Sequence, residues 1–257
     1  MSIRTTAILN LKGGVAKTTT AINMAAILAR NHGSRVLLID ADSQCNTTEF
    51  FGVDSSGSNL AEILRNAQHY DDPGAYAAGC IQGTQYDRIH LLPGDEMLMD
   101  MDLSKVEQGT VCSNVLRYLV EEVKDMYDHI LIDCPPAFNA ASAAALIAAD
   151  DVIIPIKLDA FSLRGMGNLM RQIKNMRKIN PRLKIAGLLP TMWYKDLQIQ
   201  DAEKQLRDAG LPVFHHIRRS DKVDKMTFQQ DPLLISSPNS AAGVDYRKFV
   251  AEYMRRK

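Results

Sequence analysis

The chain has 257 residues, enough for one α/β domain with a large core and short for two. Its 46% hydrophobic content is typical of a globular protein, and no apolar run approaches the length of a membrane span. Four cysteines without C-x-x-C spacing and six scattered histidines indicate reduced thiols in a cytoplasmic protein and no metal site of that kind. The first strand begins almost at once, so no signal peptide is expected.

The zero net charge hides a strong asymmetry between two parts of the chain. Residues 1–163 carry 11 Lys and Arg against 21 Asp and Glu, whereas residues 164–257 carry 19 against 9. Solvated helix faces produce some segregation of this kind in any protein. A separation this large indicates one basic surface and an anionic partner for it, either DNA or an acidic membrane.

Segments typical of strands and of helices alternate along nearly the whole chain. The expected strands are residues 6–9, 35–40, 89–92, 129–133, 151–156, 185–189 and 212–214. The expected helices are residues 21–29, 59–66, 113–126, 139–149, 162–179, 198–209 and 241–254. Residues 67–88 contain Asp-Asp-Pro-Gly and scattered glycines, and they are expected to form a surface excursion. The alternation predicts a single α/β domain over residues 1–257, with a mostly parallel twisted sheet covered by helices on both faces.

The most informative stretch follows the first strand, where residues 10–20 read Asn-Leu-Lys-Gly-Gly-Val-Ala-Lys-Thr-Thr-Thr. A strand, a glycine loop, Lys-Thr and then a helix form the phosphate-binding arrangement of P-loop proteins. Gly13 and Gly14 allow a tight turn that brings backbone N–H groups against phosphate oxygens. Lys17 can then reach the β- and γ-phosphates, and the Thr18 hydroxyl can bind Mg²⁺.

The order K-G-G-x-x-K-T-T, with Lys12 ahead of the glycine pair, resembles the deviant Walker A loop of the ParA/MinD family of ATPases. The resemblance implies a P-loop NTPase fold with ATP and Mg²⁺ as cofactors. In that family the first lysine contacts the ATP of the partner subunit, so Lys12 implies an ATP-dependent homodimer. Ala16 stands where the family usually has glycine, and it is expected to slow hydrolysis more than it affects binding. The nucleotide-binding residues implied are Lys12, Gly13, Gly14, Val15, Ala16, Lys17, Thr18 and Thr19.

Two apolar strands end in aspartate, which delivers acids to the phosphate end of a parallel sheet. Residues 130–133 resemble a Walker B strand followed by the family's D-x-P-P turn, which implies that Asp133 holds Mg²⁺ through its water shell. By the same resemblance Asp40 lies near the metal, and Asp42 orients or activates the attacking water. The implied metal group is therefore Thr18, Asp40 and Asp133, and the implied catalytic group is Lys12, Lys17 and Asp42.

The resemblance covers nearly the whole chain, and members of the family differ in what they bind. Partition proteins bind DNA without sequence specificity through basic residues of the C-terminal half, whereas MinD-like regulators use a C-terminal membrane helix. The apolar face of helix 241–254 is narrow, which favours packing on its own domain and makes a membrane partner the less favoured interpretation. The candidate DNA-contacting residues are Arg164, Arg171, Arg218, Arg219 and Lys222.

The favoured interpretation is a cytoplasmic partition ATPase of the ParA/Soj type that associates with the nucleoid when it holds ATP. By resemblance, ATP closes two subunits into a sandwich dimer that binds DNA non-specifically. A ParB-like partner then stimulates a weak intrinsic hydrolysis and releases the DNA. Two alternatives remain open: a MinD-like membrane-associated positioning ATPase, and a nucleotide-sensing switch with very low turnover, suggested by Ala16.

Overall fold

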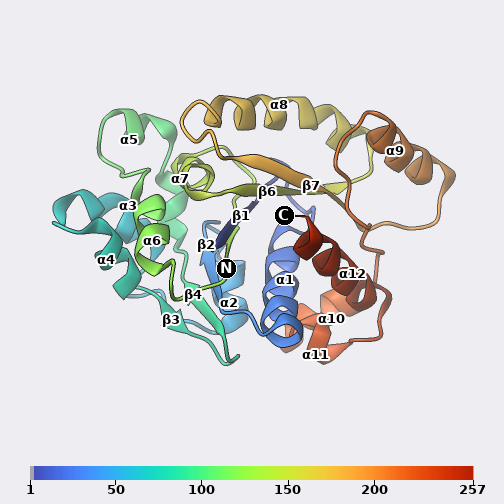
Figure 1. Cartoon of the computed structure of the whole chain (residues 1–257), viewed down its shortest axis with the longest axis horizontal. Coiled ribbons are helices and arrows are strands. Elements are labelled where there is room, and N and C mark those ends of the chain that lie inside the picture. Colours follow the sequence, from blue (N-terminus) through green and yellow to red (C-terminus); the bar gives the residue numbers. More distant parts are fainter. Residues whose placement is uncertain (1–2, 257) are drawn as a thin grey trace.

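The computed structural model describes residues 3–256, apart from the side chains of Phe161, Leu163 and Arg164. Its centre is a seven-stranded sheet with the strand order β3-β4-β2-β5-β1-β6-β7 (Figure 1). All neighbouring strands are parallel except β3, which pairs antiparallel with β4 at one edge. The strands are β1 (Arg4–Ile8), β2 (Val36–Asp40), β3 (Gln82–Gly83), β4 (Ile89–Leu92), β5 (His129–Asp133), β6 (Asp151–Lys157) and β7 (Lys184–Thr191).

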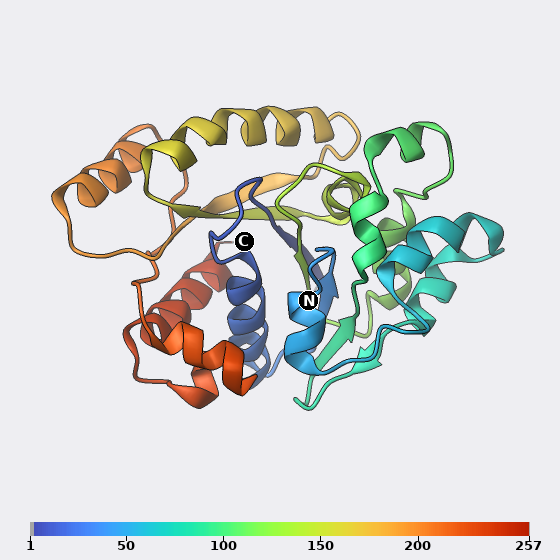
Figure 2. The same cartoon turned by 180° about the vertical axis from the view of Figure 1, so that it is seen from behind.

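Helices cover both faces of the sheet, and alternate residues along each strand pack against opposite layers (Figures 1 and 2). The central strand shows this directly, because Ala7 belongs to one hydrophobic cluster and Ile8 to the other. The helices with Ile8 are α1 (Lys17–His32), α2 (Asn46–Phe51), α10 (Lys222–Gln229), α11 (Leu233–Ser236) and α12 (Ala241–Arg255). Those with Ala7 are α3 (Leu60–Asn66), α4 (Pro73–Gly79), α6 (Val115–Val123), α7 (Ala140–Ala148), α8 (Ala160–Met176) and α9 (Leu197–Asp208), next to the short α5 (Leu103–Glu107). The predicted fold class is confirmed.

The structure differs from the sequence prediction in several regions. Residues 67–88 are not a surface excursion, because α4 lies within them and buries Ala77. A Cβ added at Gly74 would lie 2.9 Å from the backbone oxygen of Tyr118, so this glycine is what lets α4 approach α6 closely. Residues 212–214 contribute a single bridge between Val213 and Leu188 and no strand. The helices α2, α5, α10 and α11 were not predicted either.

The last helix packs on its own domain, as its narrow apolar face predicted. Tyr246, Phe249, Val250 and Tyr253 of α12 are all at most 1% exposed, and they join the cluster that contains α1. The Tyr253 hydroxyl also forms a 2.8 Å hydrogen bond with the hydroxyl of Thr6 in β1. In the described part of the chain, no helix is both long and apolar enough to cross a membrane.

Candidate functional site

The strand register brings the predicted site residues to one edge of the sheet. Asp133 at the end of β5 is paired with Ile8 of β1 on one side and with Asp40 of β2 on the other. The loop after β1 and both strand-end carboxylates therefore meet at the carboxyl edge. A cavity of about 900 Å³ opens there, and its walls include residues 13–19, Asp42, Met192, Arg218 and Val223.

The loop between β1 and α1 forms an open, glycine-lined cradle, and a residue of another strand supports it from behind. Gly14 has a φ of 68°, and added Cβ atoms at Gly13 and Gly14 would meet nothing within 4 Å, so the space before the backbone is free. The hydroxyl of Thr191 in β7 donates to the Val15 carbonyl at 3.1 Å. Lys17 is only 6% exposed, and its Nζ donates to the Lys12 carbonyl at 3.4 Å. A buried ammonium beside free backbone groups is an arrangement suited to a phosphate anion.

Ala16 is a strained residue in this cradle. It precedes α1 with φ 67° and ψ 36°, the left-handed conformation that L-residues other than glycine adopt at a cost of about 1 kcal/mol or more. Alanine is therefore strained at the position where the family usually has glycine. The surrounding contacts keep Ala16 in this conformation. The Ala16 carbonyl accepts a 2.7 Å hydrogen bond from the Thr20 hydroxyl, and the neighbouring Val15 carbonyl is bound by Thr191.

Replacing Ala16 by glycine is expected to stabilise the protein by about 0.5–1 kcal/mol, because glycine adopts this conformation without strain but loses more entropy on folding. A thermal melt should show the midpoint rising by about 2 °C. Ala26→Gly is the matched control, since Ala26 is buried inside α1, and it should lower stability by about 1 kcal/mol. A lower midpoint for the Ala16 variant would contradict the strained geometry.

The two strand-end carboxylates are fully buried and differ in their partners. The Oδ2 atom of Asp40 accepts hydrogen bonds from the backbone N–H and the hydroxyl of Thr48, at 2.8 and 2.7 Å. The Oδ2 atom of Asp133 accepts a 2.8 Å bond from the Thr47 hydroxyl, but its Oδ1 atom has no partner among the described residues. A buried carboxylate oxygen without a hydrogen-bond donor is rare, and a bound cation would satisfy it.

The pKa shifts of Asp40 and Asp133 also indicate a site for a cation. Burial raises the pKa of Asp40, and the nearby Asp133 raises it further. Burial also raises the pKa of Asp133, although the hydroxyls of Thr18 and Thr47 act in the opposite direction. Two buried acids beside a hydroxyl form a hard oxygen donor set, and Mg²⁺ fits it. Asp133 has the free oxygen for such an ion, whereas both oxygens of Asp40 already accept hydrogen bonds.

Helix α2 supplies functional residues that the sequence did not reveal. Thr47 and Thr48 hold Asp133 and Asp40, and the hydroxyl of Thr48 also accepts a 2.9 Å hydrogen bond from the Gly94 N–H. Asp42, which lies at the cavity wall, accepts a 3.1 Å bond from the N–H of Gln44. The only sequence signal was two adjacent threonines shortly after an Asp-x-Asp strand end.

Lys12 is bound within its own chain. Its Nζ donates to both carboxylate oxygens of Asp159, at 2.9 and 3.0 Å, and to the Ser162 hydroxyl at 2.8 Å. Asp159 also caps the N-terminus of α8 by accepting a 2.8 Å bond from the Ser162 N–H. Burial opposes ionisation, yet these hydrogen bonds lower the pKa of Asp159 to about 2. The cross-subunit role of Lys12 stays a prediction, and it requires this ion pair to open.

The candidate DNA-contacting residues differ in their exposure and in their ion pairs. The Arg218 guanidinium binds Asp245 at 2.7 and 2.9 Å and lies in the cavity wall, and its contact with DNA stays a prediction. Arg219 and Arg171 are exposed, and Lys222 pairs with Asp221 at 3.2 Å. The side chain of Arg164 lies outside the described residues.

Comparison with known proteins places this geometry in a family. A family model described as an AAA domain matches residues 3–185. The chromosome partitioning protein ParA of Caulobacter vibrioides is 35% identical over 99% of this chain and 95% of that protein. The chromosome-partitioning ATPase Soj of Thermus thermophilus is 33% identical over 99% and 96%. A solved structure of cobyrinic acid a,c-diamide synthase from Mycobacterium smegmatis, with bound ADP and magnesium, has a TM-score of 0.80 at 28% identity, covering 98% of this chain and 94% of that one. The chain therefore belongs to the ParA/MinD family of P-loop ATPases.

Proposed function

We propose that this protein is a DNA-partition ATPase that binds ATP and Mg²⁺ in the cavity at the carboxyl edge of the sheet. The observation that carries the proposal is the unsatisfied oxygen of Asp133 beside a glycine cradle that contains the buried ammonium of Lys17. The ParA and Soj relatives support the partition function, and the ADP and magnesium of the mycobacterial structure support the cofactors. Titration with a fluorescent ATP analogue tests it: binding is expected with Mg²⁺ and should weaken when EDTA removes the metal.

In this proposal different residues contact the phosphates, the metal ion and the attacking water. Residues 13–19 surround the phosphates with N–H groups, and Lys17 neutralises the β- and γ-phosphates. Thr18 and Asp133 hold Mg²⁺, which supplies positive charge to the phosphoryl oxygens when bound, while Asp40 orients the start of α2 beside it. Asp42 orients the attacking water. The strained Ala16 accounts for a weak intrinsic turnover, so a faster Ala16→Gly variant would favour this reading of the loop.

We further propose that ATP closes two copies of the chain into a dimer through Lys12. Lys12→Ala should retain ATP binding, because Lys12 is not part of the cavity wall, and should lose ATP-dependent dimerisation. Asp159→Asn is the matched variant: asparagine still caps α8, but it frees Lys12 from its ion pair, so dimerisation should occur at a lower protein concentration. Sedimentation with and without ATP measures both. A Lys12→Ala protein that still dimerises with ATP would refute the role.

The DNA part of the proposal rests on an acid-free segment. Residues 160–195 contain no Asp or Glu, and they include α8, which forms one outer edge of the molecule (Figure 1). Six basic residues of this segment are exposed on α8 and just after it, namely Arg171, Lys174, Arg177, Lys178, Arg182 and Lys184. A basic segment that itself contains no acidic residue suits the phosphate backbone of DNA, and phosphate contacts do not depend on base sequence. A ParB-like partner that stimulates hydrolysis completes the cycle that we propose.

Reversing two charges on α8 should weaken DNA binding. Arg171→Glu with Lys174→Glu is expected to lower affinity for unrelated duplexes alike, and to reduce the slope of log affinity against log salt by about 2 for each engaged subunit. Arg117→Glu with Lys124→Glu on α6 and its end changes the net charge equally on another exposed surface and should have little effect. Anisotropy titrations at two salt concentrations measure both variants with ATP. Equal losses in the two variants would contradict the assignment to α8.

A further inference from the structure

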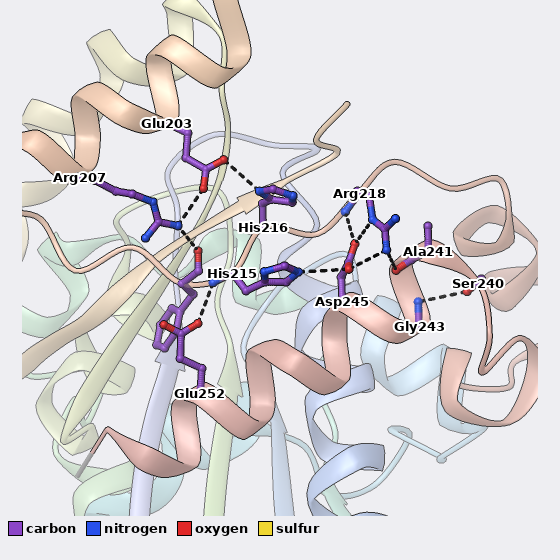
Figure 3. A network of polar contacts seen from close by, with 11 residues as sticks. Glu203, Arg207, His215, His216, Arg218, Ser240, Ala241, Gly243, Asp245 and Glu252 are labelled. Atoms are coloured by element: carbon purple, nitrogen blue, oxygen red, sulfur yellow. Dashed lines mark hydrogen bonds and ion pairs between the residues drawn. The ribbon is translucent and has the colours of Figure 1, made fainter. Parts of the chain in front are cut away.

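Asp245 of α12 is the centre of a polar network that joins three separate segments (Figure 3). Its carboxylate is buried, and it accepts hydrogen bonds from Arg218 Nε at 2.7 Å, Arg218 Nη2 at 2.9 Å and the Arg218 backbone N–H at 3.1 Å. The His215 ring lies 3.2 Å from the same carboxylate. Burial raises the pKa of Asp245, but the bonds from Arg218 and His215 outweigh burial and leave it below its ordinary value. Asp245 is therefore ionised.

This ion pair fixes the plane of the Arg218 guanidinium. Two parallel N–H···O bonds restrict a planar fork far more than a single contact does. The Arg218 backbone is also held, because Trp193 donates to the Ile217 carbonyl at 2.9 Å and accepts from the Arg219 N–H at 2.8 Å. The Arg218 side chain nevertheless remains 42% exposed, and it lies in the wall of the 900 Å³ cavity. A buried carboxylate thus holds a charged, flat group at an open wall.

The position of this wall indicates what it contacts. Residues 13–19 account for the phosphates, so the part of the cavity that includes Met192, Tyr194 and residues 217–221 is left for the nucleoside. A planar guanidinium stacks on aromatic rings as well as binding anions. Helix α12 also contacts the phosphate side, because the Tyr246 hydroxyl lies 3.3 Å from the Thr20 hydroxyl, which donates to Ala16. One helix turn therefore supports both parts of the cavity.

We propose that Asp245 is a positioning residue that holds Arg218 as a wall against which the base of the bound nucleotide stacks. The inference rests on the proposed ATP site and adds the residues that recognise the nucleoside. It assigns to the Arg218–Asp245 pair a role in binding ATP, separate from the role of Lys17 in binding phosphate. The two roles can be separated with a ligand that has phosphates and no nucleoside.

The experiment measures displacement of a fluorescent ATP analogue by ATP and by inorganic tripolyphosphate. Asp245→Asn keeps the shape of the side chain and removes its charge, so ATP affinity should fall about tenfold while tripolyphosphate affinity stays within twofold of wild type. Glu252→Gln is the control on the same helix. Its carboxylate accepts bonds from the His215 N–H at 2.8 Å and Arg256 at 2.6 Å, and it is not part of the cavity wall, so its affinities should be unchanged.

Three results would overturn the inference. The first is unchanged ATP affinity in the folded Asp245→Asn protein, and the second is an equal loss for ATP and tripolyphosphate, which indicates general damage to the fold. If Asp245→Asn does not fold, Arg218→Gln is titrated in its place, and unchanged ATP affinity there is the third. A wild-type protein that binds tripolyphosphate but not ATP would refute the ATP site itself, and so separates that failure from a failure of the positioning role.

Discussion

Replacing Lys17 by alanine is expected to weaken ATP binding by about a hundredfold or more. The change removes a buried ammonium from the cradle, where we assign it charge-assisted hydrogen bonds to two phosphates, each worth about 1.5–3 kcal/mol. Isothermal titration calorimetry with ATP and Mg²⁺ measures the loss directly. Hydrolysis and every ATP-dependent property should disappear with it.

Lys124→Ala is a suitable control for this variant, because Lys124 is an exposed lysine whose closest acidic partner, Glu121, lies at 3.7 Å. Such a pair contributes little to stability, so ATP affinity and stability should both stay near wild type. Nucleotide affinity that survives in the Lys17 variant would mean that the cavity does not hold phosphate at residues 13–19.

Asp133→Asn is expected to have opposite effects on stability and activity. Without nucleotide, the variant should be more stable than wild type by about 2 kcal/mol, because asparagine still accepts the Thr47 hydrogen bond but removes a buried, partly unsatisfied charge. With Mg²⁺ and ATP the order should reverse, since wild type gains binding energy that the variant lacks. Hydrolysis should fall by orders of magnitude. Thermal melts with and without Mg²⁺ and ATP measure the stability difference between variant and wild type under both conditions.

The pH dependence of this difference has a definite sign. The pKa of Asp133 is higher in the folded chain than its unfolded value of about 3.9, so the folded state favours the protonated carboxyl. Stability is therefore lost as the pH rises through the folded pKa, and the advantage of asparagine should be largest near pH 8 and shrink toward pH 5. Asp151→Asn is the contrasting control: it breaks a 2.6 Å ion pair with Arg4 and should destabilise the protein. An Asp133→Asn protein less stable than wild type at pH 8 would show that the buried charge of Asp133 does not destabilise the fold.

The features that sequence reasoning found are local or periodic. The glycine loop, the helix after it and the two strands that end in Asp40 and Asp133 are each contained in a short run of residues. Parallel pairing then brings such strand ends to one edge whatever the rest of the chain does. The same logic explains why the layers were predicted, since a period of two or 3.6 residues is set by backbone geometry.

The features that it missed depend on contacts between distant residues. Helix α2 has only six residues and no strong apolar period, and it is fixed because Thr47 and Thr48 bind buried carboxylates. Asp159 lies 147 residues from Lys12, and no local pattern links the two. The same is true of Arg218, because the buried Asp245 that binds it lies 27 residues away and no local pattern links the two.

The acid-free segment at residues 160–195 has a consequence for how the molecule approaches other charged bodies. With a formal net charge of zero and an isoelectric point near 7.0, the chain has no long-range attraction to a polyanion as a whole. Its charge is nevertheless distributed unevenly, because residues 160–195 carry basic residues and no acids while residues 1–163 carry an excess of acids. An uneven charge distribution orients a molecule near a polyanion, so we expect the acid-free segment to face DNA during an encounter. The protein should also bind to cation-exchange and anion-exchange resins alike at neutral pH.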